Sequence, residues 1–446
     1  MSALPSRRYG MLPALPQPSK FGSVIRVSVG NFLEMYDFMV FGYYATAIGR
    51  AFFPNRSEYA SLMLSLMTFG TGYLMRPLGA IILGAYIDHH GRRKGLLLTL
   101  GLMAIGTFSI GCLPGYETLG LLAPLLVVAG RLVQGLSAGV EIGGVSVYLA
   151  EIATPGHKGF YVSWQSASQQ IAVMFAAVLG IVLSAALPPE RMLAWGWRIP
   201  LLIGSMLVPF LFILRRSLVE TGEFLARKHR PGTQEIWRTL AANWRLVLLG
   251  MMLSTTTTVT FYLITAYMPT YGNTVLRLTS LQSMLVTLCA GASNFVWLPV
   301  MGALSDRVGR RPLLTLFSLL ALLTAYPVLL WLVNAPSFAR LLAVAMWFSL
   351  IFGSYNGAMV VYLTEIMPAQ VRASGFSLAY SLATGIFGGF TPAVSTYLIH
   401  VTGNRAMPGI WLSFAGAMGL TATALLQRVP QQRHRTVNAV NELPVG

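Results

Sequence analysis

Long apolar runs alternate with short polar connectors along the whole chain. A window of about 19 residues finds twelve apolar stretches, each long enough to cross a bilayer as a helix. They lie at 24–49, 59–87, 95–113, 120–151, 159–187, 197–214, 244–270, 281–304, 312–334, 339–366, 373–399 and 408–427. Lipid offers the backbone no hydrogen-bond partners, so spanning segments of this length are expected to be α-helices. The pattern therefore predicts an all-α membrane protein with twelve transmembrane helices.

The composition agrees with a chain whose surface faces lipid. Of the 446 residues, 55% are hydrophobic and only 10% are charged, whereas soluble proteins carry about 25% charged residues. The net charge of +17 is spread over the connectors, which argues against a basic groove for nucleic acid. Cys112 and Cys289 both lie in apolar runs, so neither a disulfide framework nor a metal site is expected. We expect no cofactor, and no set of catalytic groups points to an enzyme.

The distribution of basic residues predicts the orientation. The connectors on one side of the predicted membrane hold most of the 31 lysine and arginine residues. By the positive-inside rule that side, which carries both termini, is cytoplasmic. The organisation we expect is a tail at 1–23, a six-helix bundle at 24–214, a basic linker at 215–243, a second bundle at 244–427 and a tail at 428–446.

The two predicted bundles repeat each other's motifs. The pattern G-x-x-x-D-x-x-G-R-R occurs at Gly84–Arg93 and again at Gly302–Arg311. Tyr-Leu-x-Glu-Ile ends the fourth stretch at Tyr148–Ile152 and the tenth at Tyr362–Ile366, at nearly the same offset. Such a duplication is the plan of secondary transporters, in which the substrate site lies between the halves. The charged residues of the two loops are predicted to hold a gate: Asp88, Arg92, Arg93, Asp306, Arg310 and Arg311.

The doubled loop and the twelve-span layout resemble the major facilitator superfamily. The segments Gly30–Phe38, Arg76–Ala80 and Gly196–Pro200 resemble its metabolite–proton symporter branch. Longer strings resemble citrate–proton symporters and tricarballylate carriers: Gly144–Pro155, Ser163–Gln165 and Gly375–Thr384. The resemblance implies the import of a tricarboxylate with protons by alternating access, by a monomer in the bacterial inner membrane. His89 departs from the pattern, because arginine is usual at that position of the first loop.

Acidic residues inside spans are the candidates for proton coupling, since a charge at the centre of a bilayer is costly to keep. Asn31, Glu34 and Asp37 follow one face of the first span, and Glu141 lies in a polar stripe that runs from Arg131 to Tyr148 in the fourth. We assign proton coupling to Asp37, Glu34 and Glu141. The resemblance suggests that Asp37 pairs with Arg131 and that protonation of Asp37 frees this arginine for an anionic substrate. A static ion pair that locks two helices is the alternative.

Arginines inside the first half favour an anionic substrate. Arg76 and Arg131 both lie well inside spans, and guanidinium groups bind carboxylates through two parallel hydrogen bonds. The second half has no deep arginine or lysine and offers neutral donors, among them Tyr262 and Tyr380. The predicted substrate-binding set is Arg131, Arg76, Asn31, Gln134, Gln165, Gln169, Tyr355, Asn356 and Tyr380.

Several alternatives stay open at this point. Another organic acid, such as 2-oxoglutarate or shikimate, would also suit buried arginines. Sodium is an alternative to the proton as the coupling ion. The sequence does not separate citrate from tricarballylate.

Overall fold

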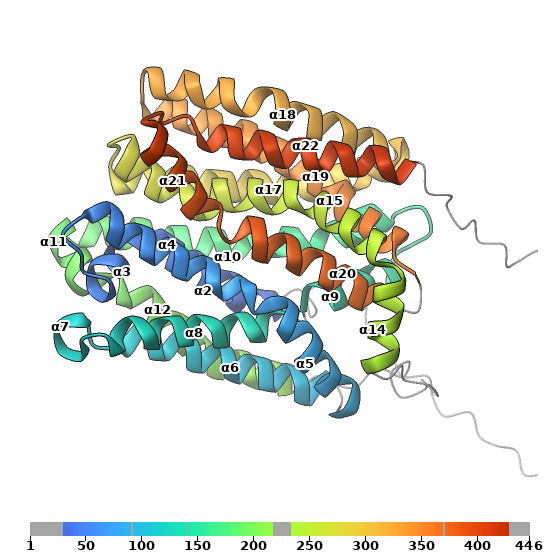
Figure 1. The fold of residues 1–446 in the computed structure, drawn as a ribbon, viewed down its shortest axis with the longest axis horizontal. Helices are drawn as coiled ribbons and strands as arrows, with labels where there is room; N and C mark the ends of the chain where they lie inside the picture. Colours follow the sequence, from blue (N-terminus) through green and yellow to red (C-terminus); the bar gives the residue numbers. More distant parts are fainter. Residues whose placement is uncertain (1–29, 91, 140, 217–232, 369–370, 428–446) are drawn as a thin grey trace, which may run out of the picture.

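The structure is a computed structural model that describes residues 30–90, 92–139, 141–216, 233–368 and 371–427 (Figure 1). These residues form helices and turns and no strand. The helices of the first half are α2 (Gly30–Tyr43), α3 (Ala45–Phe52), α4 (Glu58–Leu74), α5 (Arg76–His90), α6 (Arg92–Cys112), α7 (Tyr116–Leu119), α8 (Leu122–Ala138), α9 (Glu141–Ile152), α10 (Lys158–Ala186), α11 (Pro189–Arg191), η1 (Met192–Gly196) and α12 (Arg198–Arg216).

The second half follows α14 (Thr233–Ala242), a short helix inside the segment that the sequence marked only as a linker. Its helices are α15 (Trp244–Tyr262), η2 (Leu263–Tyr267), α16 (Met268–Thr270), η3 (Tyr271–Val275), α17 (Ser280–Val308), α18 (Arg310–Asn334), α19 (Phe338–Ile366), α20 (Arg372–Ala383), η5 (Thr384–Gly388), α21 (Thr391–Thr402) and α22 (Pro408–Gln427). The η elements are π-helical turns. The predicted tails and most of the predicted linker fall outside the described residues.

Each of the twelve predicted stretches coincides with one helix or with a run of consecutive helices. In the described part of the chain, nine helical runs are long and apolar enough to cross a membrane on their own. A tenth is the pair Pro189–Gly196 and Arg198–Pro209, which is bent by 45°. The remaining two stretches correspond to the shorter apolar helix Leu97–Cys112 and to α2 with α3, whose predicted stretch begins before the first described residue.

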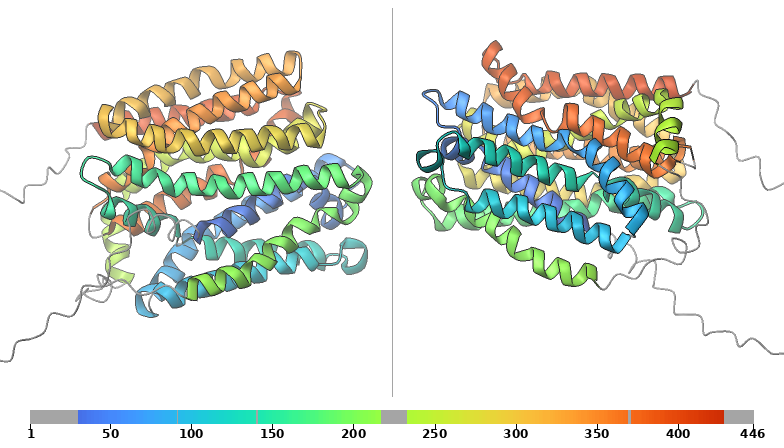
Figure 2. Two further views of the ribbon diagram at one scale, coloured as in Figure 1. Left: turned by 180° about the vertical axis from the view of Figure 1, so that it is seen from behind. Right: turned by 60° about the horizontal axis from the view of Figure 1, so that its bottom comes forward.

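The helices gather into two bundles that follow the two halves of the chain. In Figure 1, α6, α8 and α12 lie on one side, and α18, α19 and α22 lie on the other. The seam between them is formed chiefly by α10 against α17, which run side by side in Figure 2. It is completed by α4 against η5 and α21, and by α20 against α5 and α9.

The pattern of exposure is that of a protein dissolved in lipid. Large apolar side chains point outward around both bundles, among them Phe108, Leu125 and Leu323, each more than half exposed. The charged side chains of Arg76 and Arg131 are almost wholly buried. This inversion is favourable only where the surrounding solvent is apolar.

The two bundles touch at both ends of the seam. We call the end that carries the two repeated loops the motif end. There Gly159 of α10 and Gly302 of α17 approach so closely that a Cβ on Gly159 would lie 2.3 Å from the Gly302 carbonyl oxygen. At the opposite end the ring of Tyr59 stacks on His400, with ring centroids 3.8 Å apart. The two halves are therefore in contact at both ends of the seam.

Candidate functional site

Four charged side chains meet near the middle of the first bundle, and we call them the four-charge cluster: Glu34, Asp37, Arg76 and Arg131. The two carboxylates stand one turn apart on α2, Arg76 is the first residue of α5, and Arg131 lies in α8. All four side chains are buried, with exposed fractions of 5%, 0%, 1% and 0% in that order. The charges sum to zero, which is the condition under which a low-dielectric interior can hold them.

Each carboxylate of the cluster has its own arginine. The Arg76 guanidinium donates a hydrogen bond to Glu34 Oε1. Arg131 Nη1 stands 3.8 Å from Asp37 Oδ2, so the sequence prediction that these two residues meet agrees with the geometry. The pairing of Glu34 with Arg76 was not predicted.

The Asp37–Arg131 pair is loosely made. Within the described residues neither carboxylate oxygen of Asp37 accepts a hydrogen bond, and Arg131 Nε and Nη2 donate none. Arg131 Nη1 instead donates to Gln134 Oε1 at 2.7 Å, and Gln134 Nε2 donates to Thr107 Oγ1 at 3.2 Å. The pair therefore keeps unused donors and acceptors, which a proton or a substrate carboxylate would engage.

Aromatic rings cover the guanidinium groups of the two arginines. The ring of Phe38 lies under both guanidinium groups, with its centroid 4.3 Å from Arg131 Cζ and 5.1 Å from Arg76 Cζ. Tyr73 covers Arg76 at 4.8 Å, and Phe41 covers Arg131 at 4.5 Å. Desolvated contacts of this cation–π kind partly replace the lost hydration of a buried arginine.

The second predicted span is interrupted directly before Arg76. Because Pro77 has no N–H, it cannot donate to the carbonyl of Tyr73, and α4 ends at Leu74. The second predicted span is thus two helices, and Arg76 stands at the start of the second.

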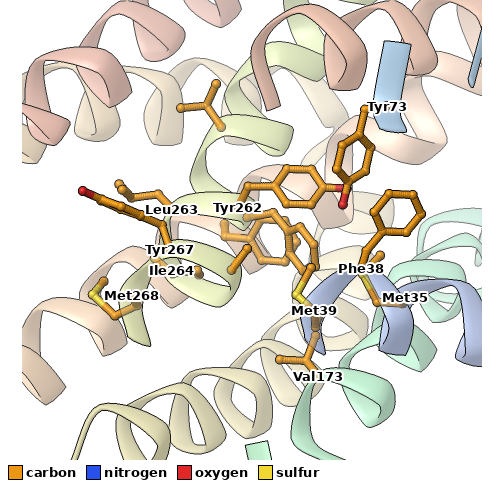
Figure 3. Close-up of a cluster of buried hydrophobic side chains, with 14 of the residues drawn as sticks. Met35, Phe38, Met39, Tyr73, Val173, Tyr262, Leu263, Ile264, Tyr267 and Met268 are labelled. Carbon is orange, nitrogen blue, oxygen red and sulfur yellow. The ribbon is translucent and has the colours of Figure 1, made fainter. Parts of the chain in front are cut away.

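The second half contributes hydroxyl groups at this point. Tyr262 at the end of α15 and Tyr380 in α20 lie within electrostatic range of Arg76. The rings of Tyr73 and Tyr262 are 5.0 Å apart between centroids, and their hydroxyl groups point toward one another across the seam (Figure 3). Tyr380 belongs to the predicted substrate set. Tyr73 does not, although its position three residues before Arg76 placed it on the same helical face.

The other predicted neutral residues are spread along the seam and the second bundle. Gln165 and Gln169 are buried in α10, and Gln165 accepts a hydrogen bond from the neighbouring Ser166. The amide that crosses the seam is Gln170, which sequence reasoning missed, and it accepts from Asn294 Nδ2 at 3.1 Å.

Two neighbouring residues of α19 differ in how their polar atoms are used. The Tyr355 hydroxyl donates to the Leu253 carbonyl oxygen at 3.0 Å, inside its own bundle. The amide of Asn356 is 1% exposed and makes no hydrogen bond within the described residues. The side chains of the remaining predicted residues lie outside the described part of the chain: Asn31, Glu141, Asp88, Arg92 and Arg93.

The loop motif of the second half connects the two bundles at the motif end. Asp306 Oδ1 accepts the Gly159 N–H at 2.8 Å and Asp306 Oδ2 accepts the Phe160 N–H at 3.0 Å, at the start of α10. Arg310 Nη2 holds the same carboxylate at 2.7 Å. Arg311 stays within the second half, where its Nε donates to the Tyr362 hydroxyl. An acidic side chain at a helix N-terminus is favourable because it meets unpaired N–H groups and the positive end of the helix dipole.

No three His, Cys, Asp or Glu side chains come together as a metal site in the part of the chain that the structure describes. The functional groups of the site are two carboxylate–guanidinium pairs and the hydroxyl groups of nearby tyrosines. Such a site can exchange a proton and bind an anion.

Comparison with known proteins agrees with this fold. The chain is 59% identical to the citrate-proton symporter of Salmonella typhi over 414 residues, which cover 93% of this chain and 95% of the relative. It is 60% identical to the citrate-proton symporter of Klebsiella pneumoniae, over 92% of each chain. The alpha-ketoglutarate permease of Escherichia coli (strain K12) is 35% identical over 84% of this chain and 87% of its own length.

Solved structures share the fold at low sequence identity. The crystal structure of a D-xylose-proton symporter superposes with a TM-score of 0.75 at 18% identity, and covers 94% of this chain and 99% of its own. The sequence also matches the Major Facilitator Superfamily over residues 27–382 and again over residues 284–445. The chain therefore belongs to the major facilitator superfamily.

Proposed function

We propose that the protein imports a tricarboxylate, citrate or tricarballylate, together with protons by alternating access. The observation that carries this proposal is the four-charge cluster: two buried arginines, each paired with a carboxylate of α2. Buried arginines suit an anion with several carboxylates. The citrate-proton symporters of Salmonella typhi and Klebsiella pneumoniae, at 59% and 60% identity, support the same substrate class.

The cluster suggests how the substrate and the proton depend on one another. While Asp37 is ionised it competes with the substrate for Arg131, at 3.8 Å. A proton on Asp37 removes that competitor, and the unused Nε and Nη2 of Arg131 become available to a substrate carboxylate. Proton binding and substrate binding then favour each other, which is the requirement for symport.

The seam supplies the alternating gates. We propose that the motif end is cytoplasmic, as are both termini, and that the protein lies in the bacterial inner membrane as a monomer of two bundles, 24–214 and 244–427. Asp306, Arg310 and Arg311 are the proposed gating residues for which contacts are described, and Asp306 binds across the seam to Gly159 and Phe160. Release of these two bonds would let the motif end open while the opposite end stays closed.

The second candidate substrate is 2-oxoglutarate. It is favoured by the 35% identity to the alpha-ketoglutarate permease of Escherichia coli (strain K12). A dicarboxylate would leave one fewer negative charge to be met by the hydroxyl groups of Tyr262 and Tyr380.

Counterflow in proteoliposomes distinguishes these possibilities. Purified protein is reconstituted into liposomes, and the liposomes are loaded with unlabelled citrate, tricarballylate, 2-oxoglutarate or shikimate. The exchange of each labelled acid into these liposomes is then measured. We expect exchange with tricarboxylates, and net uptake that an inward proton gradient stimulates and a protonophore abolishes. Uptake that follows a sodium gradient and ignores the proton gradient would contradict the proton assignment.

A further inference from the structure

We infer that Glu34 is a second proton site, separate from Asp37, so that two protons bind with each tricarboxylate. This inference rests on the proposed function and specifies its stoichiometry. Its basis is the presence of two ion pairs where one would suffice for coupling. Glu34 hydrogen-bonds Arg76, whereas Asp37 faces Arg131 at 3.8 Å.

The two pairs have different surroundings. Arg131 hydrogen-bonds Gln134 and lies over the rings of Phe38 and Phe41, and Tyr262 is the second-half ionisable group within its electrostatic range. Around Asp37 the other ionisable group of note is the neighbouring Tyr36, whose hydroxyl donates to the Pro200 carbonyl oxygen at 2.7 Å.

The Glu34–Arg76 pair instead lies at the seam. The ionisable groups around it are Tyr73 of the first half and Tyr262 and Tyr380 of the second half. A substrate between the halves would therefore meet Arg76 together with two second-half hydroxyl groups, and Arg131 together with that of Tyr262.

Charge balance fixes the number of protons. The four-charge cluster is neutral and at most 5% exposed, so an uncompensated charge added to it is costly. A substrate carboxylate that reaches Arg76 while Glu34 is ionised would place two negative charges on one guanidinium. A proton on Glu34 removes this excess, and the same holds for Asp37 and Arg131. When each of the two arginines takes one substrate carboxylate, the cluster takes up two protons, and the third carboxylate of the substrate keeps its charge.

The substrate and two protons are the only charges that move in the cycle, so a fully ionised tricarboxylate crosses with one net negative charge. Each proton comes from the aqueous phase on the side where the substrate enters, and it bonds to one carboxylate oxygen of Glu34 or Asp37. When the substrate leaves on the other side, both protons are released there and each arginine returns to its carboxylate. The third carboxylate of the substrate meets no third buried arginine in the described residues, and the hydroxyl groups of Tyr262 and Tyr380 are the donors left for it.

Proton uptake on binding tests the inference without needing transport. Citrate is titrated into the full chain in detergent by calorimetry, at alkaline pH where citrate is fully ionised. Buffers with different heats of ionisation then give the protons taken up per citrate bound. We expect about two for the parent and about one for Glu34→Gln and for Asp37→Asn. Glutamine resembles protonated glutamate in shape, so the Glu34→Gln variant should bind citrate at least as tightly as the parent.

Two control variants separate titration from structure. Glu34→Asp keeps an ionisable group beside Arg76 and should keep the parent's proton count. Glu58→Gln removes an exposed carboxylate that pairs with Arg50 at 2.6 Å outside the cluster, and should also keep it. If Glu34→Asp takes up as many protons per citrate as the parent and Glu34→Gln takes up fewer, a purely structural role of Glu34 would not explain the difference.

Each contrary result has a definite meaning. A parent that binds citrate with one proton would overturn the second site and leave the proposed function standing. The same holds if Glu34→Gln keeps the parent's count, or if it folds by thermal melt and no longer binds citrate. A parent that binds no tricarboxylate at all would overturn the proposed function, and this inference with it.

Discussion

The bond between Asp306 and the start of α10 gives the most direct test of the proposed gate. Asp306 accepts the backbone N–H groups of Gly159 and Phe160 at 2.8 and 3.0 Å, and its side chain is 5% exposed. Asparagine in its place keeps one acceptor oxygen but turns the other position into an NH₂ group. This group cannot accept the second N–H, and the negative charge at the N-terminus of α10 is lost.

The size of the effect follows from these contacts. A hydrogen bond to a charged group contributes about 1.5–3 kcal/mol, and a charge at a helix N-terminus contributes about 0.3–1 kcal/mol. Arg310 loses its partner at 2.7 Å but keeps Glu365 at 3.3 Å, which offsets part of the change. We expect Asp306→Asn to destabilise the closed motif end by about 2 kcal/mol, which shifts the population toward the open form about 30-fold.

Distance measurement at the motif end reads this population directly. Spin labels are placed at Lys94 and Gln427, two exposed residues at the motif ends of the two bundles, in protein whose Cys112 and Cys289 are serine. Asp306→Asn should add a longer distance between the labels. The matched control is Glu365→Gln, which removes the other acidic partner of Arg310 and leaves the bonds to α10 intact. An unchanged distance distribution in Asp306→Asn, or an equal shift in the control, would refute the reasoning.

Three further changes should have separable effects. Gly143→Ala places a Cβ 2.7 Å from the Ala373 carbonyl oxygen across the seam, so initial uptake should fall severalfold, whereas Gly144→Ala, with nothing within 4 Å, should match the parent; equal rates in both would contradict the close approach. Arg131→Lys keeps the charge but loses the two-point grip, so citrate affinity by calorimetry should drop at least about tenfold, and full affinity would make Arg131 structural. Asn356→Leu removes a buried amide that has no hydrogen-bond partner among the described residues, so it should stabilise the protein by about 1–3 kcal/mol, seen as a higher melting temperature, while it weakens citrate binding; a destabilised variant would mean that the amide is satisfied in the folded protein.

The spans were predictable because they depend on local sequence. A stretch of about 19 apolar residues must form a helix in lipid wherever it lies. The interruptions were not predictable in the same way. The stretch 373–399 is continuous in hydropathy, yet α20 ends at Ala383 and a π-helical turn follows. That turn packs against the first half, where a Cβ on Gly385 would lie 3.0 Å from the Tyr73 carbonyl oxygen. A contact between residues so far apart in sequence leaves no local signal.

The charged residues of the site were predictable because each is costly in a span. This cost pointed to Glu34, Asp37, Arg76 and Arg131, and to Glu141, whose side chain lies outside the described residues. It could not pair Glu34 with Arg76, because a pair depends on how the helices rotate. The same uncertainty applies to α10, where Gln170 hydrogen-bonds Asn294 of the other half and was not among the predicted residues. The roles of Phe38 and Tyr73 were hidden for another reason. Aromatic residues are common in apolar runs, and only the position of the guanidinium groups distinguishes these two.

Several helix interruptions lie next to the residues of the four-charge cluster or next to the tyrosines around it. The break between α4 and α5 lies between Tyr73 and Arg76, and α15 gives way to a π-helical turn directly after Tyr262. Tyr380 stands three residues before the end of α20, where the next π-helical turn begins. Tyrosines from both halves thus lie at helix breaks around Arg76. π-helical turns are often found at functional sites, and broken helices near the midplane are where transporters bind their substrates. If Glu34 and Asp37 bind the coupling protons as we propose, the change in their charge occurs beside these helix breaks, which is where we expect proton binding to affect the opening of either end.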